Sequence, residues 1–288
     1  GNPPTTRAVK PEDAIAHVFT PQTPGGMPEA AVITHGRLIE AACFNGRIVL
    51  DLKPADTLYV PLPFFHPYAL IFSWPCVLPA GAALALGRGF SAESFWGDVQ
   101  NFNATAWCYT GEHCRSLLNQ DEKPGDRSHT LTRIFGSGLQ PDIWTEFKTR
   151  FGIHQVFEMY GTPGSNLFFV NRFNLDNTIG TCAGSHAIVK YDEKAGKPVT
   201  NNKGFLQTVR RGETGLLLEE ITDAGPGPRF PCADAAESSI LRHVFRQGDA
   251  WLNTGVLLRA IGYGHASFAR RAGPEKTCEA REQEREMP

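Results

Sequence analysis

The residues best suited to contact a charged ligand lie between Thr20 and Pro28, a stretch dense in threonine, proline and glycine. Such a loop can bring backbone N–H groups and hydroxyls close to a phosphate, and Thr23, Gly25 and Gly26 are its candidate ligand residues. Glycine-rich patterns also occur in many ordinary turns, and composition alone favours a plain hairpin loop. The apolar runs on either side predict strand, tight loop, strand.

The other residues that could catalyse a reaction or bind a ligand are isolated in the sequence. His66 follows two phenylalanines, where a structural histidine is more common than a ligand. The nine histidines show no H-E-x-x-H spacing and the seven cysteines no C-x-x-C, so no metal site is predicted. No convincing Ser-His-Asp or Cys-His set is present, and the catalytic residues stay unknown. The first strand lacks a following G-x-G-x-x-G, which disfavours a Rossmann-type dehydrogenase.

Composition narrows the class of protein. A hydrophobic share of 41% supports a sizeable core, and a net charge of −2 without a basic stripe disfavours nucleic acid as a partner. Scattered cysteines, odd in number, favour reduced thiols in an intracellular protein. No uninterrupted apolar run reaches about 18 residues, so no transmembrane span is expected. The polar first ten residues predict no signal peptide.

Periodicity predicts the elements that position these residues. Strands and helices alternate from residue 15 to about 160, which indicates a doubly wound, mainly parallel α/β sheet. Ser91 is a candidate N-cap, with Phe95, Val99 and Phe102 facing inward. The predicted helices cover residues 36–45, 68–77, 91–101, 111–119 and 142–151, with a turn at 78–81. The predicted strands cover 56–63, 82–86, 104–109, 131–135 and 156–160.

Beyond residue 180 short strands at 187–189, 215–219 and 256–260 alternate with Gly- and Pro-rich turns, which predicts a smaller β-rich subdomain. We therefore expect a disordered lead at 1–13, an α/β subdomain at 14–178, the β-rich subdomain at 179–272 and a charged, disordered tail at 273–288.

The loop frame resembles the phosphate loop of the AMP-forming acyl-CoA synthetases, which reads roughly Tyr-Thr-Ser-Gly-Thr-Thr-Gly-Leu-Pro-Lys. Gly26-Met27-Pro28 and the following segment Ala30–His35, which begins with the apolar run Ala30–Ile33, fit that pattern. Tyr109–Asn119 and Gly136–Trp144 are similar to stretches of one subfamily, the fatty acid transport proteins and very-long-chain acyl-CoA synthetases. Leu62–His66 looks like the family's Leu-Pro-Leu-Tyr-His.

The resemblance implies that the chain forms part of the large N-terminal domain of the adenylate-forming fold. It places the Gly-x-Gly turn beside adenine, a tyrosine stacked on the base, and an aromatic–histidine pair by the acyl pocket. The implied acyl-pocket residues are Phe65 and His66. The implied nucleotide-binding residues are Thr23, Gly25, Gly26, Gly136, Ser137, Gly138, Tyr160, Gly161, Thr162 and Arg271.

The activity implied is that of a long-chain fatty acid–CoA ligase. The fatty-acid carboxylate attacks the α-phosphate of ATP with Mg²⁺ stabilising the phosphate charge, and CoA then displaces AMP. Partners would be a long-chain fatty acid, ATP or AMP, and CoA. Intracellular location with peripheral contact to peroxisomal or endoplasmic reticulum membranes is a further expectation from the resemblance.

The sequence departs from the family pattern at four ligand-type positions. Glu29 stands for lysine, Pro163 for threonine, Gly164 for the Mg²⁺-binding glutamate and Val256 for the ribose-binding aspartate. Losing one transition-state charge partner costs roughly 10²- to 10³-fold in rate. The family's mobile C-terminal domain with its catalytic lysine has no counterpart in these 288 residues.

Two hypotheses therefore stay open. The chain is a fatty acid–CoA ligase with impaired chemistry, or it is a catalytically inactive lipid- or nucleotide-binding remnant or interaction module.

Overall fold

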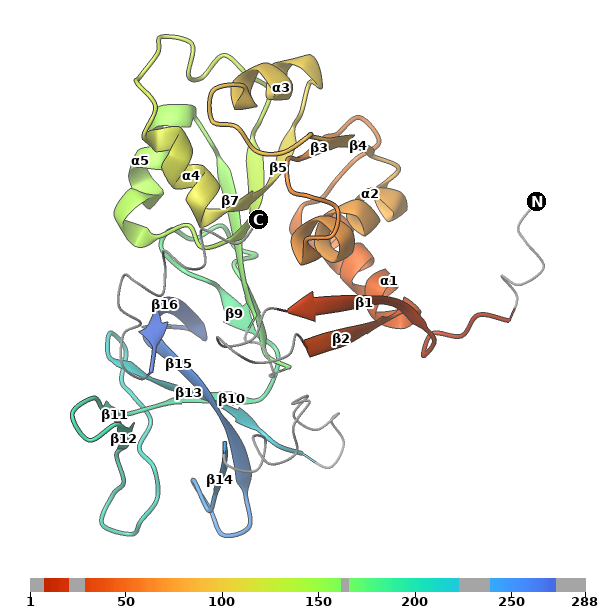
Figure 1. Ribbon diagram of the computed structural model, residues 1–288. Helices are drawn as coiled ribbons and strands as arrows, with labels where there is room; N and C mark the ends of the chain where they lie inside the picture. The colour runs from red at the N-terminus through yellow and green to blue at the C-terminus, as the bar shows by residue number, and fades with distance from the viewer. Residues whose placement is uncertain (1–7, 21–28, 162–165, 223–238, 273–288) are drawn as a thin grey trace. The chain divides into compact units, whose positions relative to one another are not determined.

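The protein is represented by a computed structural model (Figure 1), which describes residues 8–20, 29–161, 166–222 and 239–272. These residues divide into two compact units. The first contains the chain up to Glu158 together with Arg172–Asn177, and the second contains Met159–Asn171 and the chain from Thr178 onward.

A parallel sheet forms the centre of the first unit, with strand order β4-β3-β5-β6-β7. Apolar residues dominate its strands because both faces are covered. The strands are β3 (Thr57–Val60), β4 (Ala83–Leu86), β5 (Ala106–Thr110), β6 (Arg133–Ser137) and β7 (Gln155–Gly161).

The direction of each crossover decides which face its helix covers. The chain moves from β3 to β4 in one direction, and then from β4 through β5 and β6 to β7 in the other. Right-handed crossovers therefore place the later helices together on one face, as Figure 1 shows. These helices are α3 (Phe95–Asn101), α4 (Gly111–Leu118) and α5 (Pro141–Phe151). The doubly wound, mainly parallel α/β class is thus confirmed.

The face under these helices holds the main apolar core. Phe95, Val99 and Phe147 are buried against Trp107 of β5. Two local expectations are wrong. The residue at the N-cap position of α3 is Ser94, because Ser91 begins a preceding turn, and Phe102 remains 44% exposed although it stacks on Tyr59.

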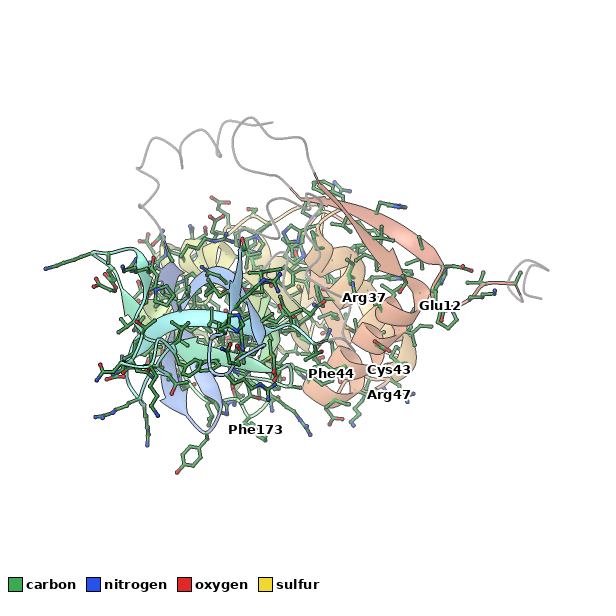
Figure 2. The ribbon with its side chains drawn as sticks, turned by 90° about the horizontal axis from the view of Figure 1, so that it is seen from below. Glu12, Arg37, Cys43, Phe44, Arg47 and Phe173 are labelled. Carbon is green, nitrogen blue, oxygen red and sulfur yellow. The ribbon has the colours of Figure 1, made fainter. Side chains whose placement is uncertain are left out.

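The opposite face is covered by helical turns that include π-helical segments. They are η3 (Tyr68–Ser73) and α2 (Trp74–Ala80), preceded in the chain by α1 (His35–Cys43) and η2 (Phe44–Val49). The turn predicted at 78–81 is wrong, since α2 continues through Pro79 and ends at left-handed Gly81. Cys43, Phe44 and Arg47 lie on the exposed side of the first turns (Figure 2).

The two strands predicted near the N-terminus are confirmed as β1 (Ala14–Thr20) and β2 (Glu29–Thr34), and the loop predicted between them lies outside the described residues. These strands pair antiparallel and form a separate two-stranded sheet. The start of the alternating pattern therefore does not belong to the parallel sheet. Thr34 caps α1 directly after β2 by accepting a hydrogen bond from the Arg37 N–H.

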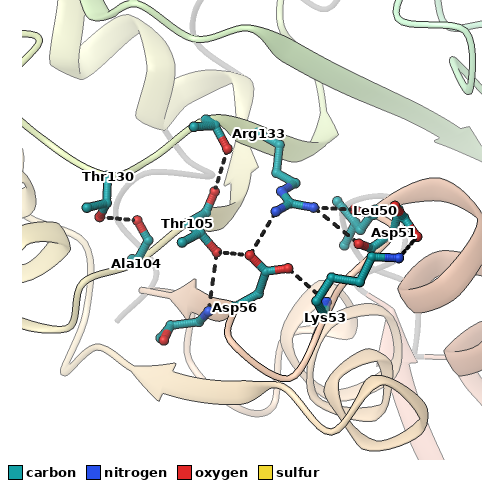
Figure 3. A network of polar contacts seen from close by, with 10 residues as sticks. Leu50, Asp51, Lys53, Asp56, Ala104, Thr105, Thr130 and Arg133 are labelled. Atoms are coloured by element: carbon teal, nitrogen blue, oxygen red, sulfur yellow. Dashed lines mark hydrogen bonds and ion pairs between the residues drawn. The ribbon is translucent and has the colours of Figure 1, made fainter.

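The N-terminal edge of the parallel sheet is held by a polar network (Figure 3). The Asp56 carboxylate accepts hydrogen bonds from the Thr105 hydroxyl at 2.7 Å and from the Arg133 guanidinium at 2.8 Å. Arg133 also donates to the carbonyl of Leu50 at 2.8 Å. Because these residues begin or precede β3, β5 and β6, the network fixes the ends of three strands.

The second unit is β-rich, as expected. Its larger antiparallel sheet has the order β10-β13-β15-β14, with β16 also paired to β15. β15 is 13 residues long, whereas the sequence predicted a strand only at 256–260. These strands are β10 (His186–Val189), β13 (Thr214–Glu220), β14 (Ile240–Arg242), β15 (Ala250–Gly262) and β16 (His265–Arg271).

Shorter strands complete this unit. The last residues of β7, Met159–Gly161, belong to the second unit and pair antiparallel with β8. β8 in turn pairs antiparallel with β9. A small hairpin joins β11 to β12. The short strands are β8 (Phe168–Val170), β9 (Thr181–Cys182), β11 (Tyr191–Asp192) and β12 (Lys197–Pro198).

Candidate functional site

The C-terminal edge of the parallel sheet gathers most of the first unit's candidate residues. In open α/β sheets, ligands bind at this edge where the strand order reverses, which here lies between β3 and β5. Phe65 and His66 follow β3, and Gly136–Gly138 close β6. Topology therefore brings both predicted groups to one edge.

Backbone packing and backbone conformation explain why glycine occupies both positions of the Gly136-Ser137-Gly138 turn. A Cβ on Gly136 would collide with the backbone carbonyl oxygen of Tyr109 in β5, and one on Gly111 would collide with the Gly138 carbonyl. Gly138 has a φ of 95°, a left-handed conformation that favours glycine. The bare side of Gly136 is thus occupied by the neighbouring strand, and Gly138 is the turn glycine that backbone conformation requires.

A buried carboxyl group lies directly behind this turn. Glu158 of β7 is 3% exposed and accepts hydrogen bonds from the Tyr109 hydroxyl and the Gly138 N–H, with the Leu139 N–H at 3.4 Å. Burial raises the pKa of Glu158 to about 8, although these three hydrogen bonds act in the opposite direction. Burial likewise raises the pKa of Tyr109, and the Glu158 charge adds to that shift.

The two implied acyl-pocket residues differ in exposure. Phe65 is 81% exposed, whereas His66 is half-buried, stacks on Tyr68 and accepts a hydrogen bond from the Tyr68 N–H at 3.2 Å. Burial lowers the pKa of His66. Burial, with a smaller effect from His66, lowers the pKa of His113 to about 4. The His113 ring stacks on that of Phe90 with 4.0 Å between the ring centroids, so this part of the edge is aromatic.

The second unit holds the other described candidates. Tyr160 and Gly161 end β7, and the Tyr160 ring packs 5.4 Å from that of Phe268 in β16. Arg271 ends β16 and is exposed. Val256, the residue that pairs with it across the sheet, is fully buried among apolar side chains. The position that would hold a ribose-binding aspartate is therefore part of the core.

Asp249 serves its own loop. Its carboxylate accepts hydrogen bonds from the backbone N–H groups of Val244, Phe245 and Arg246 at 2.6, 2.9 and 3.2 Å. It also accepts one from the Trp251 indole at 3.0 Å. Partial burial opposes ionisation, but these hydrogen bonds outweigh it and lower the pKa of Asp249. A turn-capping role accounts for all of these contacts.

Several predicted residues lie outside the described part of the chain. They are Thr23, Gly25, Gly26 and Thr162, together with Pro163 and Gly164. Within the described residues, no group of three or more His, Cys, Asp or Glu is arranged to hold a metal ion. In the same part of the chain, no helix combines the length and apolarity needed to cross a membrane.

Sequence reasoning missed Glu158 and His113. The signal for Glu158 was a single acidic residue inside the predicted buried strand 156–160, because a charge in such a strand must find partners. His113 lay within a stretch used only as a subfamily marker, and its burial depends on the long-range stacking with Phe90.

Family comparison identifies the class of protein. The AMP-binding enzyme family matches residues 2–213, and the chain belongs to this family. Among curated proteins it is 42% identical over 272 residues to the medium/long-chain-fatty-acid–CoA ligase FadD6 of Mycobacterium tuberculosis. It is 34% identical over 264 residues to the long-chain fatty acid transport protein 2 of Rattus norvegicus.

These alignments cover 94% and 89% of the chain, but only 45% and 42% of the two relatives. The chain thus spans less than half the length of either protein. The names of both relatives agree with the resemblance to fatty acid–CoA ligases and fatty acid transport proteins.

Solved structures agree on the fold. A crystal structure of the anthranilate CoA ligase AuaEII with anthranoyl-AMP superposes with a TM-score of 0.66 at 18% identity, covering 91% of this chain and 48% of that one. A benzoate CoA ligase from Burkholderia xenovorans LB400 superposes with a TM-score of 0.65 at 16% sequence identity. The superposition covers 92% of this chain and 50% of that one. The fold is that of the adenylate-forming CoA ligases.

Proposed function

We propose that this chain is the nucleotide- and acyl-binding part of a fatty acid–CoA ligase. The observation that carries the proposal is the family match, together with relatives named as fatty acid–CoA ligase and long-chain fatty acid transport protein. The proposed reaction is ATP-dependent adenylation of a long-chain fatty acid, followed by transfer of the acyl group to CoA.

The proposed roles are assigned unit by unit. In the first unit Gly136–Gly138 would face the base. In the second unit Tyr160, Gly161 and Arg271 remain proposed nucleotide-binding residues. Phe65 and His66 would line the acyl site, and the exposed Phe65 ring offers apolar surface to a hydrocarbon chain. Thr23, Gly25, Gly26 and Thr162 remain proposed phosphate-side residues.

Among the described residues, no group of three or more His, Cys, Asp or Glu is arranged to hold Mg²⁺. We assign it no residue and no step. Intracellular location and peripheral contact with peroxisomal or endoplasmic reticulum membranes remain proposals from the resemblance.

Burial of Val256 favours a second candidate, a binding module that retains a pocket without catalysis. A valine in the core cannot accept hydrogen bonds from ribose hydroxyls. Such a module would bind an acyl chain or nucleotide and turn over neither.

One assay separates the two candidates. Acyl-dependent exchange of labelled pyrophosphate into ATP is measured with palmitate, alongside thermal stabilisation by palmitate, ATP and AMP. Exchange above the no-enzyme background supports the ligase. Stabilisation without exchange supports the binding module, and neither effect would overturn both.

A further inference from the structure

A buried polar cluster joins the ends of three neighbouring strands in the first unit. We call it the Glu158 cluster, and it consists of Tyr109 in β5, Gly138 and Leu139 after β6, and Glu158 in β7. Tyr109 is fully buried and Glu158 nearly so. A polar group with so little solvent access depends on its protein partners.

The carboxyl group of Glu158 connects a side chain to a main-chain turn. One oxygen accepts from the Gly138 N–H, and the other accepts from the Tyr109 hydroxyl and the Leu139 N–H. Two successive backbone groups are thus held by one side chain from the adjacent strand. This fixes the direction in which the chain leaves β6 and enters α5, whose N-cap position is Gln140.

A second contact holds the turn from another direction. The Gly138 carbonyl lies against the bare Cα of Gly111, so closely that neither position accommodates a Cβ without movement of the main chain. Ser137, between the two glycines, is half-buried. The turn is therefore restrained by β7 through hydrogen bonds and by the start of α4 through backbone contact.

We propose that Glu158 is a positioning residue for the nucleotide, because its carboxyl group holds the Gly136–Gly138 turn in the conformation that receives the base. This inference rests on the proposed function of that turn. Glu158 itself acts through the main chain of Gly138 and Leu139, whose amide hydrogens it binds. A preformed turn binds more tightly because no ordering cost is paid on association.

Replacement of Glu158 by glutamine tests the cluster with almost no change in volume. Both oxygens of the Glu158 carboxyl group keep acceptor capacity whether or not the group is protonated, whereas a glutamine amide offers one acceptor oxygen and an NH₂ group that must face at least one of the three donors. Glu158→Gln should therefore release one backbone N–H of the turn. Tyr109→Phe removes only the hydroxyl and should have the smaller effect.

The experiment uses the full 288-residue chain with AMP as the probe. AMP affinity is measured by titration calorimetry, and exchange of the Gly138 and Leu139 amide hydrogens by NMR. Glu158→Gln should weaken AMP binding about tenfold, which corresponds to one lost hydrogen bond, and speed exchange at both amides. Thermal stabilisation by palmitate should stay unchanged.

Asp56→Asn is the matched control. Asp56 is a buried carboxylate with side-chain donors of its own, but it lies at the opposite edge of the same sheet (Figure 3). It should lower stability while leaving AMP affinity and the Gly138 amide unaffected.

Unchanged exchange at Gly138 and Leu139 in Glu158→Gln would overturn the positioning role. So would faster exchange with wild-type AMP affinity, or an equal loss of affinity in Asp56→Asn. If the unaltered chain binds no AMP, the proposed nucleotide function fails and the ligand part of this inference fails with it, while the exchange data still report whether Glu158 holds the turn.

Discussion

At the scale of single residues, Glu158 couples the proposed site to pH. Its pKa of about 8 in the folded chain exceeds the ordinary value of 4.5, so the folded state holds the proton more tightly than the unfolded state. The contribution of this group to the free energy of unfolding is fully present below pH 4.5 and is lost as pH rises toward 8. Over that range the free energy of unfolding falls by at most about 1.4 kcal/mol per pH unit.

Urea unfolding of the wild type and Glu158→Gln at several pH values between 5 and 8 measures that slope, since glutamine does not titrate. The difference in unfolding free energy between the two proteins should change steadily across this range. Glu112→Gln, an exposed carboxyl on α4, is the control and should leave the wild-type slope intact. Parallel curves for wild type and Glu158→Gln would contradict the assignment.

A second residue-scale prediction concerns Val256. Restoring the family's aspartate would place a carboxylate among Leu217, Leu258 and Ala266, where it has no solvent access. Val256→Asp should cost about 3–5 kcal/mol, the penalty of an uncompensated buried charge, and should not raise AMP affinity.

Val256→Ala is the control, with an expected loss of roughly 2 kcal/mol from the vacated volume. Both values are read from urea unfolding curves, and AMP affinity from calorimetry. A stable Val256→Asp chain that binds AMP more tightly would show that the strand can turn this position toward a ligand.

At the scale of elements, close backbone packing between β5 and β6 accounts for Gly136. Gly136→Ala should lose about 2–3 kcal/mol, because a methyl group there must displace the Tyr109 carbonyl. Gly97, exposed in α3, has no atom within 4 Å of an added Cβ, and Gly97→Ala should gain about 1 kcal/mol from helix propensity. Thermal unfolding of the two variants checks both signs. Equal effects would argue against the packing explanation.

The same elements show how far sequence reasoning reaches. Apolar periodicity identified α4, α5 and the parallel strands within one to three residues, because those elements bury one face or both. It failed for the end of α2, because Pro79 was expected in a turn at 78–81 and instead lies inside the helix. It also missed the length of β15, in which Gly255 adopts a left-handed φ of 66° while the strand continues.

The candidate site was only partly predictable for a physical reason. Its residues were found through their resemblance to family motifs, and such motifs identify only the positions that face a ligand. Glu158 and Tyr109 are 49 residues apart in the chain and meet only because β5 and β7 flank β6. Local patterns carry no information on such a contact.

At the scale of the whole molecule, the division into units does not follow one cut in the sequence. The chain leaves the first unit within β7 and returns for residues 172–177. Asn174 in that return segment accepts a hydrogen bond from the Val156 N–H at 2.9 Å and donates to the His154 carbonyl at 3.0 Å. The segment therefore secures the beginning of β7, two residues before Glu158.

Asp176 adds a second anchor from the same segment. Its carboxylate accepts hydrogen bonds from the Trp144 indole at 3.0 Å and from the Lys148 ammonium at 2.6 Å, both on α5. Partial burial opposes ionisation, but the bonds from Lys148 and Trp144 outweigh it and lower the pKa of Asp176. This contribution is present above the ordinary pKa and is lost as pH falls through the lowered value.

These contacts predict that the return segment stabilises the first unit more than the second. Asn174→Ala loses two hydrogen bonds and places a Cβ-bearing residue without a polar side chain at a φ of 52°, so it should cost about 2 kcal/mol. Asn174→Gly loses the same bonds without the conformational penalty and should cost about 1 kcal/mol.

Amide exchange at Val156 and Glu158 in the first unit is compared with that at Leu216–Leu218 in the second. Faster exchange confined to β7 is the expected result, and AMP affinity should fall with it because Glu158 shares that strand. If amide exchange became equally faster in both units, the two units would unfold as one cooperative body. The return segment would then stabilise the whole chain and not the first unit alone.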